Sequence, residues 1–170
     1  MKPSKKILIQ KMKNFIYNED LFVEKCKKYN QKPSIIFDMR VDFADMPVSA
    51  KTVDGDILLN EQMYEKYIDG EKDIFFLLRY LIHEAIHHLQ QKQPDFKEER
   101  EQHLKDMRGE EDGEKYLLDP MEMEAFSTQI DFQEKYEDPE KIQEYLEQLL
   151  DHHDIEGKER EEIKGGLLDG

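Results

Sequence analysis

The pattern of hydrophobic and polar positions predicts helices in five segments and extended chain in three. The helical segments cover about residues 5–29, 61–68, 72–91, 120–136 and 139–152. The first forms one long helix or two short ones, with Asn18 as the break in the second case. The extended segments are residues 34–39, 47–53 and 56–60.

Turn and cap residues mark several boundaries between these segments. The Asp-Gly pair at 54–55 predicts a hairpin between the second and third extended segments. A second Asp-Gly pair, at 69–70, ends the short helix that precedes the long apolar one. Pro120 and Pro139 each predict the start of a helix, because proline is favoured at the first helical position.

The stretch between the two main groups of elements is the most polar part of the chain. Residues 95–116 predict a short helix with an acidic loop, whose glutamates form a solvated face. No internal repeat is visible, so we expect one domain over 1–170, with an N-terminal helical part (1–32), a core (33–136) and C-terminal helices (137–170). The expected class is α+β, with a small, twisted, mostly antiparallel sheet of about three strands packed on helices.

Composition and charge narrow the function classes. Of the 170 residues, 38% are charged, and the formal net charge is −15. Nucleic acid and anionic membranes are therefore not expected as partners, because like charges repel. The single cysteine, Cys26, permits no intramolecular disulfide and is expected in the core. The first apolar run, residues 7–9, is too short for a signal-peptide core, and no run is long enough to span a membrane. We expect a cytoplasmic protein and leave its oligomeric state open.

The most informative motif is HExxH, which reads His83-Glu84-Ala85-Ile86-His87 and lies in the apolar segment 72–91. Histidines four residues apart share one helix face and can hold one Zn²⁺ at about 2.0–2.1 Å each. Glu84 would lie beside the ion and could take a proton from the attacking water. Unpaired polar groups cost free energy in a buried helix, and metal ligation is a physical reason for their presence there.

A catalytic zinc normally takes a third protein ligand and keeps one position for water. The extension used by metzincins is excluded, because Gln90 and Gln93 stand where it needs glycine and histidine. His103 is the next histidine along the chain, and it lies in the polar stretch.

The better candidates for the third ligand are Glu122 and Glu124, on the helix that Pro120 opens. Residues two apart differ by about 200° around a helix, so only one of them faces the metal. We choose Glu124 ahead of Glu122 and His103, because its face carries short polar side chains that suit the packed surroundings of a ligand. These neighbours are Ser127, Thr128 and Asp131. In the opposing interpretation both glutamates are ordinary surface residues of an amphipathic helix, and neither binds the metal.

Together these features resemble the gluzincin metallopeptidases, and are most similar to their minimal ImmA/IrrE-like and phage-type members. The resemblance covers about residues 35–135: an extended segment, an Asp-Gly turn, a strand, the HExxH helix and a later helix with Glu-x-Glu-Ala. In gluzincins the third zinc ligand is a glutamate on the later helix, often followed by alanine. Glu124-Ala125 matches that placement.

The chain departs from this family at two positions. The acid that usually follows the third ligand by four residues is Thr128 here, which leaves Asp131 as its substitute. Ile86 stands where ImmA-like proteins often have glycine. The resemblance also implies that an extended segment before the active-site helix, 47–53 or 56–60, binds the substrate backbone.

The predicted function is a zinc-dependent metallopeptidase acting on a cytosolic protein or peptide, with His83, His87 and Glu124 as ligands. Glu84 is the expected catalytic base, and it favours catalysis because a structural zinc site needs no base. The alternatives are a non-catalytic, zinc-stabilised structural or interaction protein of the phage accessory type, and hydrolysis of a non-peptide amide. His88 is expected at the rim of the metal site or behind the ligand residues. Spacing does not select an oxyanion-stabilising group among Tyr80, Tyr116, Tyr136, His103, His152 and His153.

Overall fold

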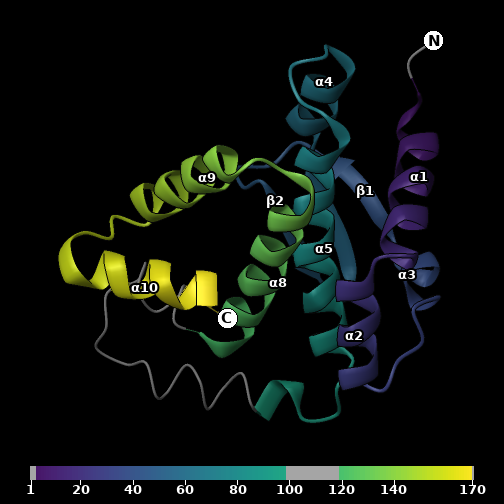
Figure 1. The fold of residues 1–170 in the computed structure, drawn as a ribbon. Helices are drawn as coiled ribbons and strands as arrows, with labels where there is room; N and C mark the ends of the chain where they lie inside the picture. Colours follow the sequence, from purple (N-terminus) through teal and green to yellow (C-terminus); the bar gives the residue numbers. More distant parts are fainter. Residues whose placement is uncertain (1–2, 99–118, 170) are drawn as a thin grey trace. The chain divides into compact units, whose positions relative to one another are not determined.

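The protein is described by a computed structural model that covers residues 3–98 and 119–169 (Figure 1). Its elements confirm the predicted α+β class. The chain divides into two compact units, Met1–Gln93 and Pro94–Gly170. The expectation of one domain with its core at 33–136 stays a prediction.

The N-terminal segment of the first unit forms two helices, α1 (Lys5–Tyr17) and α2 (Asp20–Lys28). The break falls at Asn18, as the two-helix interpretation of the sequence has it. The Ser4 hydroxyl caps α1 by accepting a hydrogen bond from the Ile7 N–H at 3.3 Å. The buried faces of the two helices carry Leu8, Met12, Ile16, Phe22 and Cys26. Cys26 is thus a core residue, as predicted.

Residues 34–39 were predicted as a strand, and this prediction is wrong. The segment contains the short helix α3 (Ile35–Asp38). Ile35, Ile36 and Met39 are buried while Phe37 is exposed, which is helical spacing and not the alternation of a strand. Because α3 packs against α1, tertiary contact overrides the β-branched composition of the segment.

Three strands form the sheet: β1 (Val41–Ala44), β2 (Ala50–Val53) and β3 (Asp56–Asn60), in the order β1-β3-β2. β1 runs parallel and β2 antiparallel to β3, so the sheet is mixed where mostly antiparallel pairing was expected. The predicted hairpin joins β2 to β3. Asp54 and Gly55 both have positive φ, 50° and 87°, as the favoured two-residue hairpin turn requires.

The two helices after the sheet match their predictions. Helix α4 (Glu61–Ile68) begins after Asn60, whose side-chain oxygen accepts a hydrogen bond from the Gln62 N–H at 2.9 Å. Helix α5 (Ile74–Gln91) is capped by Asp73 in the same way. It packs on β2 and β3, and also contacts α1, α2 and α4 (Figure 1). This central place explains why α5 is apolar on most of its surface.

The second unit contains α8 (Pro120–Tyr136), α9 (Pro139–His152) and α10 (Gly157–Asp169). The first two begin at the predicted prolines, and α8 packs against both α9 and α10. Arg160 on α10 forms ion pairs with Glu147 and Asp151, which tie α10 to α9. The predictions for residues 95–116 fall mostly outside the described residues.

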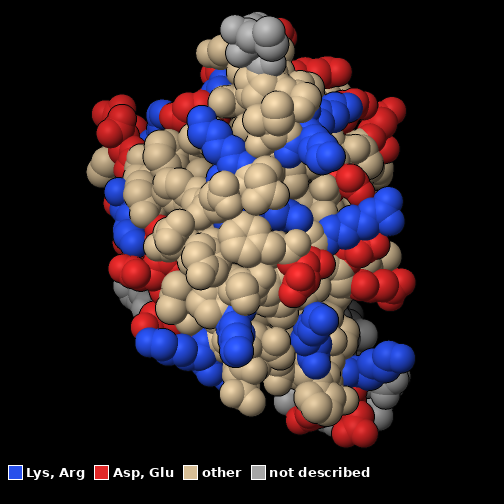
Figure 2. All heavy atoms as spheres, turned by 90° about the vertical axis from the view of Figure 1, so that its right-hand side faces the viewer, with Lys and Arg blue, Asp and Glu red and all other residues tan. Residues whose placement is uncertain are grey.

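The surface is acidic overall but not uniformly so. Figure 2 shows a face on which lysine and arginine side chains stand among acidic ones, around uncharged surface. The exposed lysines of α1 and α2 include Lys6, Lys11, Lys27 and Lys28. The expectation that anionic partners are excluded rests on net charge and stays a prediction. Among the described residues, no helix has the length and apolarity needed to cross a membrane.

Candidate metal centre

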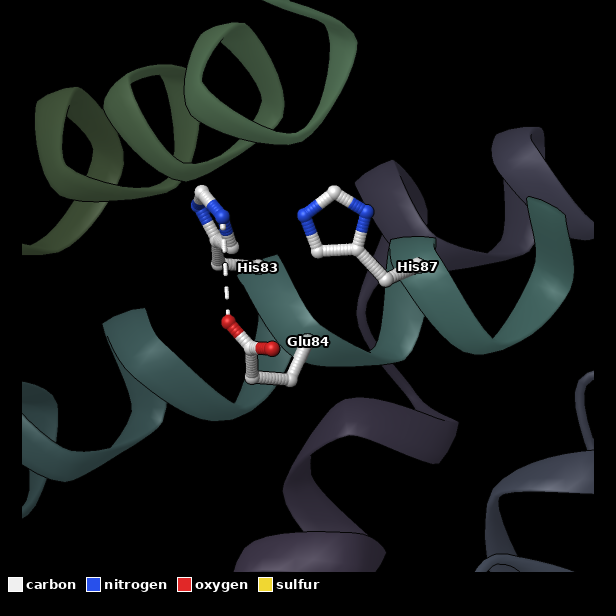
Figure 3. Close-up of side chains that lie close together, drawn as sticks. All are labelled: His83, Glu84 and His87. Carbon is white, nitrogen blue, oxygen red and sulfur yellow. Dashed lines mark ion pairs between the residues drawn. The ribbon is translucent and has the colours of Figure 1, made fainter. Parts of the chain in front are cut away.

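Helix α5 brings His83 and His87 to one face, one turn apart, as the HExxH spacing predicts. The two ring centroids are 5.0 Å apart, and the ring planes meet at 68°. His83 is buried and His87 is half-buried. Figure 3 shows both rings on the same side of α5, with the Glu84 carboxylate beside His83. Ile82, Ala85 and Ile86 around them are fully buried, so core packing fixes the rotation of the helix.

The orientation of the His87 ring is set by Gln90, a residue whose only signal in the sequence is that it excludes the metzincin pattern. Gln90 is 4% exposed, and its Oε1 lies 2.8 Å from His87 Nδ1. An amide oxygen only accepts, so Nδ1 carries a proton, and in the neutral ring this leaves Nε2 with the lone pair that a metal needs. A hydrogen bond of this kind behind the ring is what orients histidine ligands in metal sites.

Glu84 is held between the sheet and the histidines. It is 6% exposed, and its Oε1 accepts a hydrogen bond from the Thr52 hydroxyl at 2.9 Å. Its second oxygen, Oε2, lies 3.7 Å from His83 Nε2 (Figure 3). The carboxylate therefore lies next to a nitrogen of a candidate ligand, where an HExxH site would place its base. Sequence reasoning identified Glu84 and missed Thr52, because the two are 32 positions apart.

His88 joins α5 to the hairpin turn. The residue is 6% exposed, and its Nδ1 lies 2.6 Å from the Gly55 carbonyl oxygen, to which it donates. Burial lowers the pKa of His88, and this effect outweighs the hydrogen bond to the Gly55 carbonyl, which raises it. His88 thus lies against the turn, where the sequence predicted a residue at the rim of the metal site or behind its ligands.

The donors of His83, Glu84 and His87 lie close enough together to hold a metal ion. Their ligand atoms all fall within 4.8 Å of one another. Two nitrogens on one tetrahedral ion are about 3.4 Å apart, which is a separation of the same order. Two imidazoles with a neighbouring carboxylate suit zinc and similar transition metals. The donor set thus fits a bound metal.

The predicted third ligand lies on α8, in the second unit. Glu124 is half-buried there, while Glu122 is 7% exposed. The negative charge of Glu122 partly offsets the effect of burial, which lowers the pKa of His153. Thr128 donates its hydroxyl to the backbone carbonyl of Glu124 at 2.8 Å, and not to a side chain. The choice of Glu124 over Glu122 stays a prediction.

The remaining candidates from the sequence are His103, as an alternative ligand, and the residues considered for stabilising the oxyanion. His103 and Tyr116 lie outside the described residues. Tyr80 packs edge-on against Phe76 with ring centroids 5.6 Å apart. The remaining candidates belong to the second unit, where Tyr136 contacts Phe132, and His152 and His153 contact each other. None of these contacts singles out an oxyanion-stabilising group.

Comparison with known proteins adds no assignment. No family model, no curated protein and no solved structure matches the chain. Function is therefore inferred from the geometry of the site.

Proposed function

We propose that the protein is a zinc-dependent metallopeptidase of the gluzincin type, which hydrolyses a peptide bond in a cytosolic protein or peptide. The observation that carries this proposal is the buried Glu84 carboxylate, held by Thr52 with Oε2 3.7 Å from His83 Nε2. A structural metal site needs its ligands but has no use for a base beside them. The position of Glu84 therefore favours hydrolysis.

In this proposal His83, His87 and Glu124 would hold Zn²⁺. When bound, the ion would act as a Lewis acid for the scissile carbonyl and would lower the pKa of the attacking water. Glu84 Oε2 takes the proton from that water and passes it to the leaving amine nitrogen. Gln90 keeps His87 in the Nδ1–H tautomer, so that Nε2 remains the ligand atom.

The sheet suggests where the substrate backbone lies. β3 lies between β1 and β2, whereas β2 is at the edge of the sheet that the described residues form. An extended peptide adds to an edge strand through main-chain hydrogen bonds. Of the two segments considered from the sequence, β2 is therefore the one we propose for substrate binding.

Metal analysis tests the ligand set. Purified wild type should carry about one Zn²⁺ per chain, and His83→Ala or His87→Ala should lose it to a chelator. His152→Ala removes an exposed histidine and should keep the metal. Glu124→Ala should weaken zinc binding strongly while Glu122→Ala should not. Full zinc occupancy in both His83→Ala and His87→Ala would rule out the proposed site.

Activity measurements test the role of Glu84. Glu84→Gln keeps the size of the side chain and removes its basicity, so turnover of a peptide library should fall by about 10²–10⁴-fold with zinc retained. Glu65→Gln, on the exposed surface of α4, should leave turnover unchanged. Undiminished hydrolysis by zinc-loaded Glu84→Gln would refute the mechanism. A wild type with zinc but no cleavage of peptides or co-expressed proteins would favour the interaction-protein alternative.

A further inference from the structure

The hairpin β2-β3 contacts one face of α5 through a set of polar groups. Glu84, His88 and Gln91 follow one another by four and three residues, and so share this face. Thr52 binds Glu84, and the Gly55 carbonyl accepts from His88. The Gln91 amide accepts from the Gly55 N–H at 3.0 Å and donates to the Thr52 carbonyl at 3.4 Å.

We propose that Thr52 is a positioning residue for the general base. It holds Oε1 of Glu84 and thereby directs Oε2 toward the attacking water. This inference rests on the proposed function, because it assigns Thr52 a part in the same hydrolysis.

The backbone of β2 fixes where the Thr52 hydroxyl lies. Thr52 pairs with Ile57 of β3, whose side chain is fully buried. Its neighbours Lys51 and Val53 are exposed, so alternation along the strand turns Thr52 toward α5. The hydrogen bonds of His88 and Gln91 hold the adjoining turn on the helix. The hydroxyl therefore reaches Glu84 from a strand that is held by its pairing with β3 and by the hydrogen bonds between the turn and α5.

The hydrogen bond distinguishes the two carboxylate oxygens of Glu84. The Thr52 hydroxyl has one proton, which it donates to Oε1 at 2.9 Å, and it also lies 3.2 Å from the Glu84 backbone oxygen. Oε2 is the oxygen on the side of His83. A buried carboxylate that lost this donor would turn to find another, because a charge without hydrogen bonds is costly inside a protein. Oε2 would then leave the position from which it can act.

Kinetics with three variants test the assignment. Thr52→Val keeps the shape of the side chain and removes the hydroxyl, so kcat on a pooled library of quenched fluorescent peptides should fall by about 10–100-fold. KM should stay within about twofold, because the β2 backbone that we assign to substrate binding is unchanged. Thr52→Ser restores a hydroxyl and should recover most of kcat. Ser34→Ala removes an exposed hydroxyl that makes no side-chain capping hydrogen bond to α3, and it should have no effect.

Metal-free crystals of the same variants separate this inference from the proposed function. The Glu84 carboxylate should keep its position in Thr52→Ser and turn away in Thr52→Val, or in Thr52→Ala if the valine variant does not fold. An unmoved carboxylate in the variants without the hydroxyl would overturn the assignment, and so would an undiminished kcat. If the wild type cleaves no peptide, the proposed function fails while the crystals still decide whether Thr52 positions Glu84.

Discussion

Replacing Gln90 with methionine should weaken zinc binding without unfolding the protein. Methionine has a similar length but offers no strong acceptor, so His87 Nδ1 loses the hydrogen bond that it makes at 2.8 Å. Loss of such a partner behind a histidine ligand typically costs about 10–100-fold in metal affinity, or about 1.4–2.7 kcal/mol. The stability of the metal-free protein should change by only about 1 kcal/mol, since one hydrogen bond is lost and an apolar side chain is buried.

The assay is competition for zinc against a chromophoric chelator at fixed pH, together with urea unfolding of the metal-free protein. Gln93→Met is the matched control, because the Gln93 amide donates to the carbonyls of Tyr29 and Leu89 and not to a histidine. Gln90→Glu should bind zinc at least as tightly as wild type, since a carboxylate accepts the same hydrogen bond more strongly. Equal zinc affinity for Gln90→Met and wild type would refute the argument that Gln90 sets the tautomer of His87.

Three further predictions concern stability and reactivity. Gly55→Ala should cost about 1–2 kcal/mol in urea unfolding, because φ is 87° there. The new Cβ would lie 3.5 Å from the His88 ring, an ordinary van der Waals distance, so the cost comes from the backbone conformation. Burial and the neighbouring His152 lower the pKa of His153 below its ordinary 6.5, so the folded state favours the neutral ring. The contribution of His153 to stability is fully present above pH 6.5, and it is lost as the pH falls through 6.5 toward the lower pKa of the folded state. The urea midpoint should therefore drop less for His153→Gln than for the wild type between about pH 7.5 and 5.5. Burial raises the pKa of Cys26 to about 11, so a thiol reagent at neutral pH should modify it at least about tenfold faster in urea than in the folded protein.

The sequence by itself determined the elements whose signals are local. The apolar segment 72–91 forms one helix over Ile74–Gln91, because its length and hydrophobicity exclude a strand. The 3.6-residue repeat then puts His83 and His87 on one face without any help from the rest of the fold. The Asp-Gly pair at 54–55 fixed the hairpin in the same way, because few residues accept positive φ.

Tertiary structure decided what depends on contacts between distant residues. Residues 34–39 have a composition that suits a strand, but contact with α1 makes Ile35–Asp38 helical. Strand β1 then forms at Val41–Ala44, where its parallel pairing with β3 is a non-local contact.

The supporting residues of the candidate site illustrate the same division. Gln90 and Thr52 carry no sequence motif, and each acquires its role only from the atom placed against it. For Thr52 that atom belongs to a residue 32 positions away, on an element of another type. A periodic pattern specifies which face a side chain takes on its own element, but only the packing of that element against the others specifies what the side chain meets.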